Sequence, residues 1–118
     1  MPATTQLRIF AAAARSVLAQ ADYYRLHESQ ALSERWLASV SNTFLQLLHL
    51  PESRPRVSLA AYRGTELPID LRRSLVIGFP EHLIFYRYSP SDGFVKILDV
   101  TDGRRELDSV LEEMLMDE

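Results

Sequence analysis

The chain contains no cysteine and only three histidines among its 118 residues. The absence of cysteine excludes disulfides and thiolate chemistry, and it fits a reducing compartment such as the cytoplasm. His27, His49 and His82 lie far apart in the sequence, so we expect no metal site, and no motif predicts a cofactor. No apolar run approaches the roughly 20 residues of a membrane span, and the residues MPATTQLRIF form no secretory leader. We therefore expect a cytoplasmic protein without a membrane anchor.

Length and composition are typical of a single domain over residues 1–118. Hydrophobic residues make up 47% of the chain and charged residues 25%, which suits a folded core with a soluble surface. The net charge of −3 conceals a basic middle and an acidic end. The basic residues of the middle are Arg54, Arg56, Arg63, Arg72 and Arg73, and eight carboxylates follow from Asp99 onward. This pattern favours protein partners over direct DNA binding, which usually needs a net basic surface; chance clustering of solvated side chains is the alternative.

Two helices are predicted in the first half of the chain, after a short strand within Gln6–Phe10. The first covers Ala11–His27, and its apolar face consists of Ala14, Val17, Leu18, Ala21 and Tyr24. Ser29 is a suitable N-cap for the second helix, which Pro51 ends. The stripe of this second helix consists of Trp36, Leu37, Val40, Phe44, Leu47 and Leu48. A short connection between two amphipathic helices predicts an antiparallel hairpin.

The second half predicts three antiparallel strands and a closing helix. The strands are Leu71–Ile77, His82–Tyr88 and Phe94–Val100. Gly78–Glu81 is predicted as a turn or bulge, and Ser89–Gly93 as a hairpin in which Gly93 takes positive φ. The closing helix has an apolar stripe of Leu107, Val110, Leu111 and Met114. The predicted fold class is α+β: a short N-terminal strand, a two-helix hairpin, a three-stranded antiparallel sheet with helices on one face, and a C-terminal helix.

Three segments together resemble the ParE/RelE toxin superfamily of bacterial toxin–antitoxin pairs. Ala21–Tyr24 (ADYY) is similar to the family's first helix, and Leu45–Pro51 to a helix that ends in proline. Leu71–Arg73 followed by Phe79–Arg87 (FPEHLIFYR) is similar to the family's central hairpin. The resemblance covers roughly Leu7 to Leu111, and it implies the same order of elements. The chain departs from the family after the last strand, where Asp102 stands in place of a common histidine, and Arg105–Glu106 in place of an Arg–Asp pair.

Two mechanisms exist among the proteins that the chain resembles. The RelE-like branch cleaves ribosome-bound mRNA, which requires a general base, a general acid and cations. No Tyr or His follows Tyr88, Lys96 is the only lysine, and arginine is a poor base. His82, a lone histidine beside a turn, is expected to be exposed rather than catalytic. The ribonuclease is therefore the alternative reading, and a non-catalytic protein is preferred.

The ParE-like branch implies inhibition of DNA gyrase by protein binding, which needs no catalytic residue. The predicted target-binding residues are Arg72, Arg73, Arg87 and Arg105, with Tyr86 as an aromatic anchor. The resemblance also implies a cognate antitoxin whose C-terminal segment folds on the toxin. Trp36 and Phe44 are candidates for the antitoxin groove, with a purely core role as the alternative. A non-toxic interaction module of the same fold is the third reading.

Overall fold

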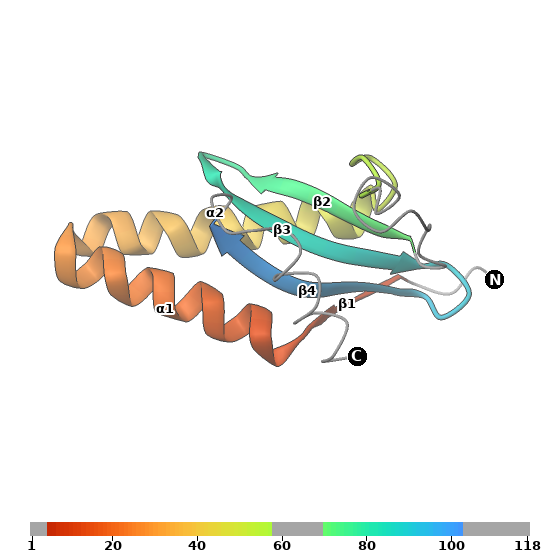
Figure 1. The fold of residues 1–118 in the computed structure, drawn as a ribbon, viewed down its shortest axis with the longest axis horizontal. Coiled ribbons are helices and arrows are strands. Elements are labelled where there is room, and N and C mark those ends of the chain that lie inside the picture. The colour runs from red at the N-terminus through yellow and green to blue at the C-terminus, as the bar shows by residue number, and fades with distance from the viewer. Residues whose placement is uncertain (1–4, 58–69, 103–118) are drawn as a thin grey trace, which may run out of the picture.

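The computed structural model describes residues 5–57 and 70–102 (Figure 1). Its elements are β1 (Gln6–Ile9), α1 (Ala11–His27), α2 (Gln30–His49), β2 (Leu71–Val76), β3 (Phe79–Ser89) and β4 (Phe94–Asp102). The strands form one sheet in the order β1-β4-β3-β2, and the antiparallel helices pack on one face of it. The structure thus confirms the α+β class and the helix layer. No helix of the described residues combines the length and apolarity needed to cross a bilayer.

The sheet differs from the predicted three-stranded antiparallel one. β2, β3 and β4 are antiparallel as expected, but β1 pairs in parallel with β4, so the sheet is mixed and four-stranded. The alternation of residues predicts that β1 is a strand, but it does not predict which strand pairs with it. Parallel strands are joined by a long crossover, so no local turn signal marks their pairing. The predicted C-terminal helix falls on residues 103–118, outside the described part of the chain.

The two helices begin and end where local signals place them. The Ser29 hydroxyl accepts a hydrogen bond from the Leu32 N–H at 3.0 Å, which caps α2, and α2 ends at His49 before Pro51. The predicted apolar face of α1 is wrong at one position, because Leu18 is 59% exposed. The buried positions of α1 are Ala13, Val17 and Ala21, so the core-facing stripe is narrower than the apolar spacing indicated. In α2, Leu37 likewise lies at the surface.

The core lies between the helix pair and the sheet. Trp36 is fully buried at its centre, and its indole N–H donates to the Val17 carbonyl at 2.9 Å, so the polar edge of the ring is satisfied inside the helical hairpin. The other members of the core include Val40, Phe44 and Leu47 of α2, and Ile84, Tyr86, Val95, Ile97 and Val100 of the sheet. Ile84, Tyr86 and Tyr88 therefore share the helix-facing side of β3, as the alternation predicts.

The connection between β2 and β3 is shorter than predicted. Only Ile77 and Gly78 form the turn, and Gly78 has φ +82°, which a residue with a Cβ adopts only with strain. β3 starts at Phe79, and the register passes from Leu75–Leu83 to Val76–Phe79. Residues 80–82 thus stand opposite a single step of β2 as a bulge, where the missing N–H of proline does not break the ladder.

Candidate functional site

Two of the predicted target-binding residues are structural. Tyr86 is 0% exposed, and its hydroxyl donates to the Pro51 carbonyl at 2.9 Å. Its register partner Arg72 has a side chain only 13% exposed, because it binds the Asp70 carboxylate and donates to the carbonyls of Glu52 and Arg54. Both side chains therefore fix the segment after α2 against the sheet, and neither presents a free contact surface.

Arg73 and Arg87 are the two predicted residues that the fold brings together on one face. Arg73 pairs with Phe85, and Leu71 pairs with Arg87, so both arginines point to the side of the sheet away from the helices. They are diagonal neighbours on adjacent strands, which places their Cα atoms about 7–8 Å apart. Arg73 is exposed and Arg87 is half-buried. Arg105 lies outside the described residues.

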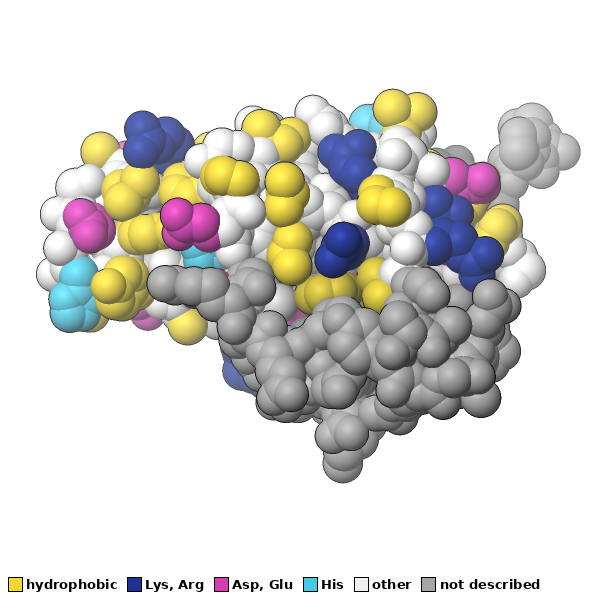
Figure 2. All heavy atoms as spheres, turned by 45° about the horizontal axis from the view of Figure 1, so that its top comes forward, with side chains coloured by type: hydrophobic (Ala, Val, Ile, Leu, Met, Phe, Trp, Pro, Cys, Tyr) yellow, Lys and Arg dark blue, Asp and Glu magenta, His cyan; other side chains and the backbone are white. Residues whose placement is uncertain are grey.

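The predicted antitoxin-binding residues lie in the interior. Trp36 is fully buried, and Phe44 is buried in the same cluster, so both serve the core that the sequence offered as the alternative. The apolar side chains that the helices do expose are different ones. They are Leu18, Tyr23 and Leu26 of α1, and Leu37 and Leu45 of α2. Hydrophobic side chains are correspondingly frequent over the helical end of the molecule, at the left of Figure 2.

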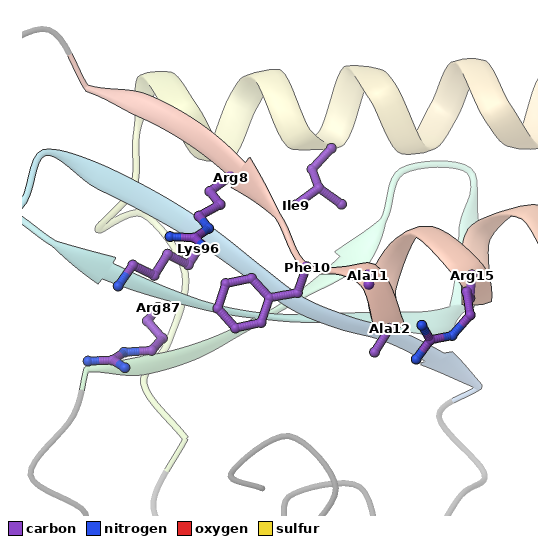
Figure 3. A pocket seen from close by; sticks show the side chains of 8 residues that line it. All are labelled: Arg8, Ile9, Phe10, Ala11, Ala12, Arg15, Arg87 and Lys96. Carbon is purple, nitrogen blue, oxygen red and sulfur yellow. The ribbon is translucent and has the colours of Figure 1, made fainter. Parts of the chain in front are cut away.

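A basic pocket lies where β1 runs into α1, and sequence reasoning missed most of it. Its volume is about 610 Å³, and its described lining is Arg8, Ile9, Phe10, Ala11, Ala12, Arg15, Arg87 and Lys96 (Figure 3). Four of these eight residues are cationic and none is acidic. Only Arg87 was predicted as functional, because the pocket depends on the parallel pairing of β1 with β4, which no local signal reveals.

His82 is not exposed, so the expectation for this residue is wrong. It is 7% exposed, and its Nε2 lies 3.2 Å from the Tyr24 hydroxyl, beside the ring of Trp36 at 4.6 Å between centroids. Burial is the main reason that the pKa of Tyr24 is raised above its ordinary value. His82 lies two residues before Ile84 on β3, so the alternation of the strand places it on the helix-facing side, which explains why a histidine next to a turn is buried. A raised pKa makes Tyr24 a weaker acid, so it is not set up to lose a proton near neutrality.

The described residues hold no group of three or more His, Cys, Asp or Glu side chains that could bind a metal ion. A second, more apolar groove of about 910 Å³ lies along β2 and is lined in part by Arg73, Leu75 and Ile77. Leu75 and Ile77 are about half exposed there. The groove follows the outer strand of the sheet, since β2 is last in the strand order.

A mixed four-stranded sheet that carries an antiparallel helix pair, with arginines on its other face, defines a small α+β protein that presents two chemically different surfaces. The family described as "ParE toxin of type II toxin-antitoxin system, parDE" matches residues 7–107. The chain therefore belongs to the ParE toxin family.

The fold agrees with a solved relative. A chain of the structure entitled "Chromosomal ParDE TA system from P. aeruginosa" superposes with a TM-score of 0.64 at 13% sequence identity. The match covers 84% of this chain and 96% of that one, so the two proteins share their architecture over nearly the whole relative. No curated protein sequence matches the chain.

Proposed function

We propose that this ParE-family toxin inhibits bacterial growth by binding DNA gyrase, and that it acts in the cytoplasm without catalysing a reaction. The observation that carries the proposal is the family match over residues 7–107. The arrangement of the sheet supports it: Arg73 and Arg87 share the face opposite the helices, and although their register partners Phe85 and Leu71 are buried there, Arg73 is exposed to a protein partner and Arg87 is half-buried beside it. Arginine is among the residues that contribute most at protein interfaces.

We further propose that a cognate antitoxin neutralises the toxin, as the parDE description implies for the family. An antitoxin segment that folds on binding needs apolar anchors on its partner. The exposed apolar residues of the helical hairpin, Leu18, Tyr23 and Leu26 among them, offer such anchors, whereas Trp36 and Phe44 are buried in the core. The antitoxin surface is thus assigned to the outer face of the helices and the target surface to the opposite face of the sheet.

A DNA supercoiling assay with purified gyrase tests the target. Addition of the chain in micromolar excess is expected to inhibit supercoiling. The Arg73→Gln and Arg87→Gln proteins should each lose potency on the order of tenfold, the cost of removing one important charged contact. Arg35→Gln is the matched control, because Arg35 is an exposed arginine on α2, away from the proposed surface.

Three outcomes would count against the proposal. Unaffected supercoiling would remove gyrase as the target. Equal potency of the control and the two sheet variants would move the contact away from Arg73 and Arg87. Cleavage of ribosome-bound mRNA by the same preparation would instead establish the RelE-like ribonuclease.

A further inference from the structure

Three cationic side chains stand in one row across three strands. Arg8 of β1 is the register partner of Lys96 of β4, and Lys96 is the register partner of Arg87 of β3. Register partners project from the same face, and neighbouring strands lie about 4.8 Å apart, so the row extends over roughly 10 Å. Like charges directly opposite each other destabilise a sheet. A fold that retains such a row therefore gains stability when an anion is bound beside it.

Two cations of the row, Arg8 and Lys96, have little compensation from the carboxylates of the described residues. The Asp92 carboxylate lies 3.9 Å from the Lys96 ammonium, at the limit of an ion pair, and that carboxylate also accepts from the Ser89 hydroxyl at 3.0 Å. Arg8 has its guanidinium 5.6 Å from the centre of the Phe10 ring, and no described carboxylate is within ion-pair distance of it. Arg8 and Lys96 thus leave positive charge at the pocket on a chain whose net charge is −3.

The N-terminus of α1 opens into the same pocket. Its N-cap is Phe10, which provides no side-chain cap, and the first turn carries no acidic residue. The first N–H groups of a helix have no acceptor within the helix and carry a partial positive charge. Ala11 and Ala12 line the pocket with small side chains, and Arg15 adds a fourth cation from the next turn of α1 (Figure 3).

We propose that this basic pocket binds phosphate groups, either the polyphosphate of a nucleotide or the phosphodiester backbone of a nucleic acid strand. Arginine forks and helix N-termini are the groups that proteins use for phosphate. The length of the row suits an anion with more than one phosphate, and a volume of about 610 Å³ is within the range of small-molecule sites. The proposal does not rest on the identity of the toxin's target, since binding is a property of the isolated chain.

Isothermal titration calorimetry of the purified chain with inorganic pyrophosphate at low ionic strength tests the pocket. Saturable binding is expected, and Arg8→Gln and Arg87→Gln should each weaken it by about tenfold or more, the usual effect of losing a charge-assisted hydrogen bond. Arg35→Gln, which removes an arginine on α2, should change the affinity by less than about threefold, the size of a distant screened charge. Absence of saturable binding, or an equal loss in the Arg35→Gln protein, would overturn the proposal.

A second variant keeps the test valid if the glutamine substitutions disturb the fold. Ala11→Asp places a carboxylate in the first turn of α1, where it complements the helix dipole, so the melting temperature should be unchanged or higher. The same carboxylate occupies the pocket and should abolish pyrophosphate binding. Undiminished binding by a stable Ala11→Asp protein would show that the anion is held elsewhere and would overturn the assignment.

Two further titrations identify the source of the phosphate. ATP and a single-stranded oligodeoxynucleotide are compared under the same conditions as pyrophosphate. Tighter binding of ATP assigns the pocket to a nucleotide, and tighter binding of the oligonucleotide, with an affinity that falls linearly on a log–log plot against salt, assigns it to a strand. Either result, if Arg8→Gln removes it, supports the phosphate site; binding of either ligand that survives both Arg8→Gln and Arg87→Gln contradicts it.

Discussion

Arg72 and Arg73 of β2 are adjacent in the sequence but differ in their contacts, because side chains alternate between the two faces of a strand. Arg72 faces the helix side, where Asp70 and two backbone carbonyls of the segment after α2 hold its guanidinium. Arg73 faces the other side and is exposed. Arg56 also forms an ion pair with Asp70, at 3.0 Å. Some of the arginines in the basic middle of the sequence therefore bind groups within the protein itself. The sequence shows which residues are basic, but the strand register decides which of them are exposed to a partner.

The hydroxyl of Tyr86 should stabilise the fold measurably. Tyr86→Phe removes its hydrogen bond to the Pro51 carbonyl, so the free energy of unfolding at neutral pH should decrease by about 1 kcal/mol. Urea denaturation measures this value. Tyr23→Phe is the control, because the Tyr23 ring is about half exposed and its substitution should leave stability nearly unchanged. Equal stabilities of the Tyr86→Phe protein and the unchanged chain would contradict the structural role.

The same hydroxyl makes the free energy of unfolding depend on pH in the alkaline range. Burial raises the pKa of Tyr86 above the ordinary value of 10.0. Above about pH 10 the unfolded chain loses this proton while the folded chain retains it, so the free energy of unfolding falls as pH rises. Below pH 10 both states hold the proton, and this group contributes no pH dependence. The Tyr86→Phe protein should therefore lose stability less steeply above pH 10, and an unchanged slope would argue against the buried hydroxyl.

At the level of elements, the helices were the most predictable part of the chain. Ala11–His27 and the cap at Ser29 follow from apolar spacing and a local hydrogen bond, which are properties of short segments. The position of β1 beside β4 depends on contacts between distant segments, so it could not be predicted from local patterns. The basic pocket depends on that pairing, which is why Arg8, Arg15 and Lys96 were not recognised as a group.

The cap of α2 gives a prediction for a whole element. Ser29→Ala removes the acceptor for the Leu32 N–H and should lower the free energy of unfolding by about 1 kcal/mol. Ser41→Ala is a matched control, because Ser41 is exposed within the same helix and alanine is the better helix former there. Thermal unfolding followed by circular dichroism at the helix band measures both. A Ser41→Ala effect as large as that of Ser29→Ala would show that capping is not what stabilises α2.

The whole molecule separates its chemistry between two faces. The helix pair covers one face of the sheet and exposes apolar side chains at its own outer surface. The other face carries cations of all four strands beside the buried side chains of Leu71 and Phe85. The proposed function requires two partners, a target and an antitoxin, and we assign each of them to one of these surfaces. The arrangement also explains how a chain of net charge −3 can gather four cations and no acidic residue in the described lining of one pocket.

Colony survival after tightly controlled induction of the chain in a bacterial host is the most direct test of toxicity and of the proposed target surface. Survival is expected to fall by orders of magnitude relative to an empty vector, because we propose that the chain inhibits bacterial growth. A double Arg73→Gln, Arg87→Gln protein, present at the same soluble level, should restore colonies, and Arg35→Gln should still prevent them. Normal growth with abundant soluble chain would contradict the assignment of toxicity, and equal killing by the double variant would contradict the assignment of the target surface.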